Sequence, residues 1–149
     1  MKIEEEIKQK KFSSEFHKAT LNVIVTASWV SNHIHNTLKP FGISQEQYNV
    51  LRILRGQHPD PCTLGTISER MVNKMSNATR LVDKLKIAGY VSRETCPTNR
   101  RKVDIAISDS GLKMLAEIDP ILLAKFEEIQ YVEDAELAKL NDILDNMRG

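Results

Sequence analysis

The chain has 149 residues, the usual size of one domain and too short for two ordinary ones. Hydrophobic residues make up 41% and charged residues 28%, with six glycines and five prolines, a composition that excludes a disordered or fibrous chain. No run of eighteen apolar residues occurs, and the N-terminal sequence has no apolar segment, so we expect neither a membrane span nor a secretory signal. Two cysteines, Cys62 and Cys96, are too few for a disulfide framework, and we expect a protein of the reducing cytoplasm.

The net charge of +1 is unevenly distributed along the sequence. Residues 61–103 contain nine Lys/Arg against three Asp/Glu, whereas residues 104–149 contain four against eleven. A basic middle followed by an acidic tail suggests a surface for a polyanion. The alternative is two solvated faces of opposite sign, and charge alone does not decide between them.

Apolar residues recur at helical spacing from about residue 12 to residue 38, which predicts one long amphipathic helix. Pro40 ends it, because proline disfavours a helical residue before it. Ile24, Val25 and Trp29 widen the apolar stripe. A helix this apolar needs cover on more than one side, and a partner subunit could supply it.

Caps and breakers divide the rest of the chain. Ser44 with Gln47 fits a capping box, Thr63 and Ser108 suit the N-caps of later helices, and Gly89 suits a helix end. The elements expected after residue 40 are a helix over 44–56, a short helix over 64–71, a break at 72–74, a helix over 74–88, strands over 90–93 and 102–107 joined by a hairpin tip at 96–101, a helix from 109, and a helix over 134–147.

Helix, short helix, helix and hairpin in this order are what a winged helix-turn-helix requires. We therefore predict a mainly α fold with a small β-hairpin wing, in a single unit over 1–149. Residues 1–40 and 109–149 are expected to form the dimerisation helices around a DNA-binding region at 44–108. Pro120 should kink the helix from Asp109 or fall in a local break.

The segment from Leu64 to Arg93 resembles the MarR family of bacterial transcription regulators. It reads LGTISERMVNKMSNATRLVDKLKIAGYVSR, and the family core, which usually reads LAERLGLSRSTVTRLVDRLEKRGLVER, matches it without a gap from Ile67. The flanks at 47–51 and 107–111 also fit, so the resemblance covers about residues 12–147. It implies a homodimeric regulator, a repressor rather than an enzyme, that binds a pseudo-palindromic operator and is released by a small ligand.

The resemblance implies that helix 74–88 enters the major groove and that the hairpin tip at 96–101 enters the minor groove. Asn77 is then expected to contact adenine, Arg80 guanine or a phosphate, and Lys84 a phosphate. A solvated helix face with an incidental basic bias is the alternative. The expected DNA-binding residues are Asn73, Lys74, Ser76, Asn77, Arg80, Lys84, Arg100, Arg101 and Lys102.

Two places depart from the family pattern. Val72 and Asn73 stand where the family turn has Gly-Leu, and Asn99 stands where the family wing has an aspartate that braces the arginine found here as Arg101. Asparagine can accept a hydrogen bond but has no charge, so we expect Arg101 to be held less firmly. We therefore expect the segment 98–102 to be mobile without DNA.

A small, aromatic effector is also implied, bound between the DNA-binding and dimerisation regions. Trp29, His33, Phe41 and Tyr48 are candidates for that pocket, and core packing is the alternative interpretation of all four.

Other chemistry finds no support in the sequence. No group of His, Cys, Asp or Glu has chelating spacing, and no catalytic set or phosphate-binding glycine loop occurs. We expect no metal, cofactor or enzymatic activity, and inert thiols at Cys62 and Cys96 rather than a redox sensor. The alternative function is a winged-helix interaction module whose basic face binds an acidic protein. Base-sized polar side chains between 73 and 80, together with Arg101, favour DNA.

Overall fold

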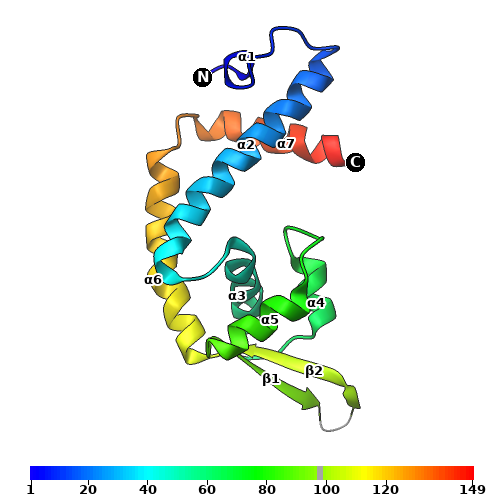
Figure 1. Ribbon diagram of the computed structural model, residues 1–149, viewed down its shortest axis with the longest axis vertical. Coiled ribbons are helices and arrows are strands. Elements are labelled where there is room, and N and C mark those ends of the chain that lie inside the picture. Colours follow the sequence, from blue (N-terminus) through cyan, green and yellow to red (C-terminus); the bar gives the residue numbers. More distant parts are fainter. Residues whose placement is uncertain (97–98) are drawn as a thin grey trace.

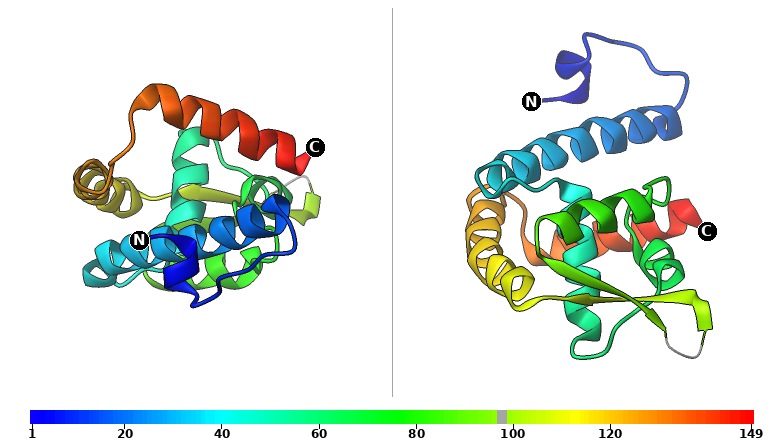
Figure 2. Two further views of the ribbon diagram at one scale, coloured as in Figure 1. Left: turned by 90° about the horizontal axis from the view of Figure 1, so that it is seen from above. Right: turned by 60° about the horizontal axis from the view of Figure 1, so that its bottom comes forward.

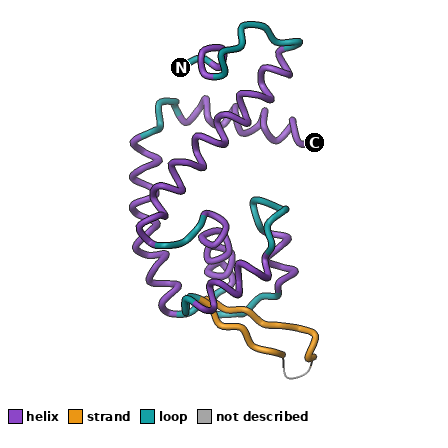
Figure 3. Tube along the Cα trace, viewed as in Figure 1, coloured by secondary structure: helices purple, strands orange, loops and turns teal. Residues whose placement is uncertain are grey.

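The computed structural model describes residues 1–96 and 99–149, with the backbone alone described at 96 and 100–102. Figure 1 shows the elements along the chain, and Figure 3 separates helices, strands and loops. In chain order they are α1 (Ile3–Glu6), α2 (Glu15–Leu38), the 3-10 helix η1 (Lys39–Phe41), α3 (Gln45–Gln57), α4 (Leu64–Arg70), α5 (Ala78–Ile87), β1 (Val91–Cys96), β2 (Asn99–Ile107), α6 (Asp109–Glu128) and α7 (Asp134–Arg148).

Side-chain caps form at the starts of the three helices for which the sequence predicted one. The hydroxyl of Ser44 accepts the N–H of Gln47 at 3.1 Å, and the Gln47 side chain accepts the N–H of Ser44 at 2.8 Å. The hydroxyls of Thr63 and Ser108 accept N–H groups in the first turns of α4 and α6. These bonds satisfy N–H groups that have no partner within the helix, and they confirm the predicted caps.

The start predicted for the helix at 74–88 is wrong, because α5 begins at Ala78. The side chain of Asn73 accepts the N–H of Met75 at 3.0 Å, and that of Asn77 accepts the N–H of Arg80 at 3.0 Å. Such local bonds compete with helical hydrogen bonds. Residues 71–77 therefore connect α4 to α5 without helical structure.

The hairpin has longer strands than predicted. β1 pairs antiparallel with β2 from Val91 opposite Ile107 to Thr95 opposite Val103, and the register shifts after Thr95. Backbone hydrogen bonds of 2.8 and 2.9 Å also join Cys62 to Ile105, so the loop before α4 pairs with the free side of β2. The strands extend into the segment predicted as the hairpin tip.

The other differences between the structure and the prediction lie in α6 and in the N-terminal segment. α6 is continuous from Asp109 to Glu128, so the local break considered at Pro120 is wrong. The short helix α1 was not predicted. It folds against α2 by burying Ile3 and by an ion pair of 2.5 Å between Glu4 and Lys18.

Most of the buried core lies where α3, α4, α5 and the hairpin meet the beginning of α6. Its fully buried side chains include Leu51, Ile67, Leu85, Ile105 and Leu115. The order α3, α4, α5 and hairpin around this core confirms the predicted winged helix-turn-helix.

The long helices α2 and α6 pack against each other. In Figure 1, α6 runs beside this unit on the left and α2 rises above it. α7 crosses the upper part of Figure 1, and the view from above in Figure 2 shows α7 and α2 apart. No residue of α7 is buried. Within residues 1–96 and 99–149, no helix is both long and apolar enough to cross a bilayer.

Candidate nucleic-acid interface

The helix α5 has two chemically distinct faces. Ala78, Val82 and Leu85 are buried in the core, whereas Arg80 and Lys84 are exposed. The buried face follows the helical period, so packing fixes which side chains point outward. Within the described part of the chain, neither Arg80 nor Lys84 forms an ion pair. Both cations are therefore available to an external anion.

Neighbouring elements hold α5 in place. It packs on α3 and on β1, and the guanidinium of Arg93 in β1 donates to the carboxylate of Asp83 in α5 at 2.6 Å. Asp83 is the one acidic residue of α5, so this ion pair neutralises the negative charge of the helix within the fold. The exposed face of α5 keeps its basic residues.

Five of the predicted DNA-binding residues line one shallow hollow beside α5. The hollow has a volume of about 420 Å³ and is also bordered by Glu46 of α3 and by Leu81. Its predicted members are Asn73, Ser76, Asn77, Arg80 and Lys84. The structure therefore brings together side chains that the sequence places on both a turn and a helix.

Three of these polar side chains are already engaged or covered. The side-chain oxygens of Asn73 and Asn77 accept backbone N–H groups within the turn and at the start of α5. The Ser76 hydroxyl oxygen is buried and has no hydrogen-bond partner among the described residues. A bidentate contact to adenine uses both ends of an amide, so the Asn77 oxygen would have to accept from the base in addition to the N–H of Arg80.

Lys74 also differs from its predicted setting. It lies in the turn before α5, and its ammonium group donates to the carbonyl oxygen of Glu69 near the end of α4. The side chain is exposed and remains a candidate for a phosphate contact, which needs no particular base.

The hairpin projects from the unit below α5 (Figure 2, right). The side chains of Arg100, Arg101 and Lys102 lie outside the described residues, and so do the predicted brace between Asn99 and Arg101 and the predicted mobility of 98–102. These remain predictions from the sequence.

Two exposed apolar residues in the turn were missed by the sequence reasoning. Met75 is 91% exposed and Val72 is 83% exposed, on either side of Lys74 and Asn73. The signal that could have identified them is the presence of two large apolar side chains in a turn whose other candidate residues are polar or basic.

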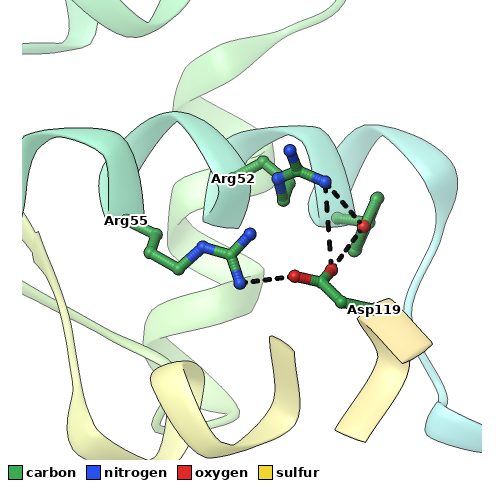
Figure 4. Close-up of polar contacts among 4 residues, drawn as sticks. Arg52, Arg55 and Asp119 are labelled. Carbon is green, nitrogen blue, oxygen red and sulfur yellow. Dashed lines mark hydrogen bonds and ion pairs between the residues drawn. The ribbon is translucent and has the colours of Figure 1, made fainter. Parts of the chain in front are cut away.

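A polar cluster joins α3 of the winged helix-turn-helix to α6 (Figure 4). The Tyr48 hydroxyl donates to one oxygen of Asp119 at 2.7 Å, and Arg55 donates to the other at 2.6 Å. Arg52 donates to the Tyr48 oxygen at 3.1 Å. Three residues of α3 thus converge on one carboxylate of α6.

The cluster shifts the ionisation of its members. Burial raises the pKa of Tyr48 above its ordinary value, and the hydrogen bond to Asp119 adds to this effect. Burial acts in the same direction on Asp119, but the hydrogen bonds from Tyr48 and Arg55 and the nearby arginine charges outweigh it and hold its pKa below the ordinary value. At neutral pH Asp119 is therefore an anion between two cations.

The four predicted effector residues do not share one pocket. Tyr48 lines a pocket of about 330 Å³ between α2, α3, α6 and the turn at 71–73. His33 and Phe41 line a second depression, and Trp29 a third. Trp29 and His33 touch edge to face at 4.5 Å between ring centroids, so their contact is with each other.

The remaining candidate chemistry concerns one thiol and metals. Cys62 is buried, and burial raises the pKa of its thiol above the ordinary value, although the charge of Arg70 acts in the opposite direction. A protonated, buried thiol is a poor nucleophile. The side chain of Cys96 lies outside the described residues. Among described residues, no three His, Cys, Asp or Glu side chains are grouped so that they could hold a metal ion.

Comparisons with known proteins agree with this geometry. The family model "MarR family" matches residues 43–103, from just before α3 to the hairpin. The uncharacterised HTH-type transcriptional regulator YkoM of Bacillus subtilis is 32% identical over 92 residues. That match covers 62% of this chain and 58% of YkoM, so the chain spans little more than half the length of this curated relative.

Solved structures extend the similarity over nearly the whole chain. The crystal structure of a MarR transcription factor from Planctomyces limnophilus is 30% identical, covers 91% of this chain and 98% of its own, and has a TM-score of 0.70. CouR from Rhodococcus jostii, solved with p-coumaroyl-CoA bound, shares the fold with a TM-score of 0.74 at 20% identity, over 91% of this chain and 95% of CouR. The relatives and the fold are those of transcription regulators and not of enzymes, and the chain belongs to the MarR family.

Proposed function

We propose that the protein is a homodimeric transcriptional repressor that binds a pseudo-palindromic operator in double-stranded DNA. In this proposal α5 and the turn before it enter the major groove, and the hairpin of β1 and β2 enters the minor groove. The observation that carries the proposal is the two-faced α5, whose buried side is packed in the core while Arg80 and Lys84 remain exposed without ion-pair partners among the described residues. A single surface thus offers cations and a helix of the right size for the groove.

Charge supports DNA as the partner. Residues 61–103 have a net charge of +6, and phosphate neutralisation supplies most of the affinity of non-specific DNA binding. An arginine at a hairpin end suits a narrow minor groove, whose potential is strongly negative. Arg100 and Arg101 are the residues that we assign to that groove.

Exposed apolar side chains support a second copy as the other partner. Phe16, Ile24 and Trp29 of α2, Leu123 of α6 and Ile143 of α7 are between 45% and 69% exposed. A monomer rarely leaves so much apolar surface in water. We propose that α2, α6 and α7 pack across a two-fold axis, which places two α5 helices to read two half-sites.

The pocket beside Tyr48 suits a small aromatic effector. Its volume of about 330 Å³ lies at the lower end of the range for small-molecule sites. Apolar walls from Ile34, Leu122 and Phe126 face the polar side chains of Tyr48 and Arg52. The pocket also touches Val72 and Asn73, so a bound molecule would act on the turn that leads into α5 and release the operator.

Selection from a random double-stranded DNA library tests the proposed function. We expect the purified full chain to enrich two inverted half-sites, about one helical turn or a multiple apart. A variant with Arg80→Ala and Lys84→Ala should enrich none, and its thermal melting should match that of the wild type because both side chains are exposed. Failure of the wild-type protein to enrich any sequence, together with binding to an acidic protein surface, would favour the interaction module.

A further inference from the structure

We propose that Met75 is a specificity-determining residue that contacts the C5-methyl group of thymine in the major groove. The proposal rests on the proposed DNA binding by α5 and adds the chemistry of the base that is read. It assigns base recognition to an apolar side chain in the turn before α5, where the sequence pointed to polar ones.

The turn holds Met75 outward on a fixed backbone. The N–H of Met75 donates to the side chain of Asn73 at 3.0 Å, and the N–H of Val72 donates to the side chain of Asn49 in α3 at 2.9 Å. The backbone on both sides of Lys74 is therefore anchored to polar side chains. Met75 is nevertheless 91% exposed, so the fold positions its backbone and leaves its side chain free.

The polar neighbours of Met75 are less free than Met75 itself. The oxygens of Asn73 and Asn77 accept backbone N–H groups, and the Ser76 hydroxyl is buried. Lys74 donates to the carbonyl oxygen of Glu69. The N-terminal end of α5 is the end that faces base edges in this class of motif. In the turn that leads into it, the unengaged side chain of reading length is thus that of Met75, beside the exposed Arg80 in the first turn of the helix.

The chemistry of the groove defines what Met75 can contact. The thymine methyl is the apolar group among the donors and acceptors of the major-groove edges. A methionine side chain is flexible and polarisable, and it adapts to irregular apolar surfaces. The exposed cations Arg80 and Lys84 of the adjoining helix α5 favour a polyanion that also presents apolar groups, which is duplex DNA.

Replacing thymine by uracil in the selected operator tests the proposal, because uracil lacks only the C5-methyl group. We expect deoxyuridine at one or two positions in each half-site to weaken wild-type binding about three- to fivefold per methyl, the factor for one buried methyl-sized group. Met75→Gln keeps the length of the side chain but makes it polar. This variant should bind the thymine and uracil operators equally at those positions.

Ile87→Gln is the matched control. Ile87 is 88% exposed at the opposite end of α5, so this variant loses a similar apolar surface and should keep the preference for thymine. Equal binding of both operators by the wild type, or an unchanged preference in Met75→Gln, would overturn the proposal while leaving DNA binding intact. If the protein enriched no sequence from the random DNA library, that result would contradict the proposed function itself.

Discussion

Gly111 lies where an added side chain has no room. It is the third residue of α6, and a Cβ there would meet the carbonyl oxygen of Tyr90 and approach Cγ1 of Ile107 to 2.7 Å. We expect Gly111→Ala to lower the free energy of unfolding by about 1–3 kcal/mol, because the backbone at Tyr90 cannot move cheaply. Urea unfolding at fixed protein concentration measures the change.

Gly56→Ala is the control for that experiment. Gly56 lies in α3, and no neighbouring atom lies within 4 Å of the position that an alanine methyl group would take there. Alanine is the better helix former at this site, so the variant should be equal to the wild type or more stable by about 0.5–1 kcal/mol. If both variants lost stability equally, steric contact at Gly111 would not be the reason.

Arg80 and Lys84 share the exposed face of α5 but should have different roles. Arg80→Ala, if the guanidinium contacts a guanine, should cost about 1–3 kcal/mol of binding free energy and relax the preference at one position of each half-site. Lys84→Ala should weaken binding to all sequences alike. Titration against a series of single-mismatch operators distinguishes the two, and identical behaviour of both variants would refute this division.

The role of a residue could be predicted from the sequence where its local pattern favoured a single role. Ser44, Thr63 and Ser108 precede apolar helical patterns, so their caps follow from the sequence. Asn73 and Asn77 combine a local backbone bond with an exposed position. The sequence pattern indicated only the exposure, because a residue that suits a base edge also suits a turn or a cap.

At the scale of elements, the cluster around Asp119 fixes how α3 meets α6. Asp119→Asn keeps an acceptor for Tyr48 but removes the charge that pairs with Arg55 at 2.6 Å. We expect the free energy of unfolding to fall by about 1–3 kcal/mol at neutral pH, the range for a charged hydrogen-bonded group. Asp145→Asn, which removes an exposed pair with Arg148 in α7, should change it by less than about 1 kcal/mol.

Asp119→Asn also predicts how the free energy of unfolding depends on pH. The folded-state pKa of Asp119 lies below its unfolded value, so its contribution is present above the unfolded value and is lost as the pH falls through the folded one. The stability difference between wild type and Asp119→Asn should therefore shrink below about pH 4. Chemical unfolding from pH 7 to pH 3 measures it, and a difference independent of pH would contradict the assignment.

The elements themselves were predictable to different degrees. Periodicity gave the inner face of α3, where Tyr48, Leu51 and Leu54 are buried. It did not give the partner of Arg55, because Asp119 is 64 residues away in the chain and no local pattern links them. The hairpin was predicted too short for a similar reason, since pairing across the two strands extends them beyond the alternating segments.

For the whole molecule, the exposed apolar surface of α2, α6 and α7 predicts a dimer. Sedimentation at micromolar concentration should show two copies, and a stable monomer would contradict the proposal. Ile143→Glu places a charge on a 57% exposed apolar position of α7 and should shift the protein toward monomer. Ile87→Glu, at an exposed apolar position of α5, should leave the oligomeric state unchanged.

The salt dependence of operator binding tests the central claim, that this surface binds the phosphate backbone of duplex DNA. A dimer that places several of its basic residues near phosphates should neutralise roughly 6–10 of them, which predicts a slope of about −5 to −9 for the logarithm of the binding constant against that of the salt concentration. Lys84→Ala should make the slope shallower. A slope near zero for the wild-type protein would contradict the account.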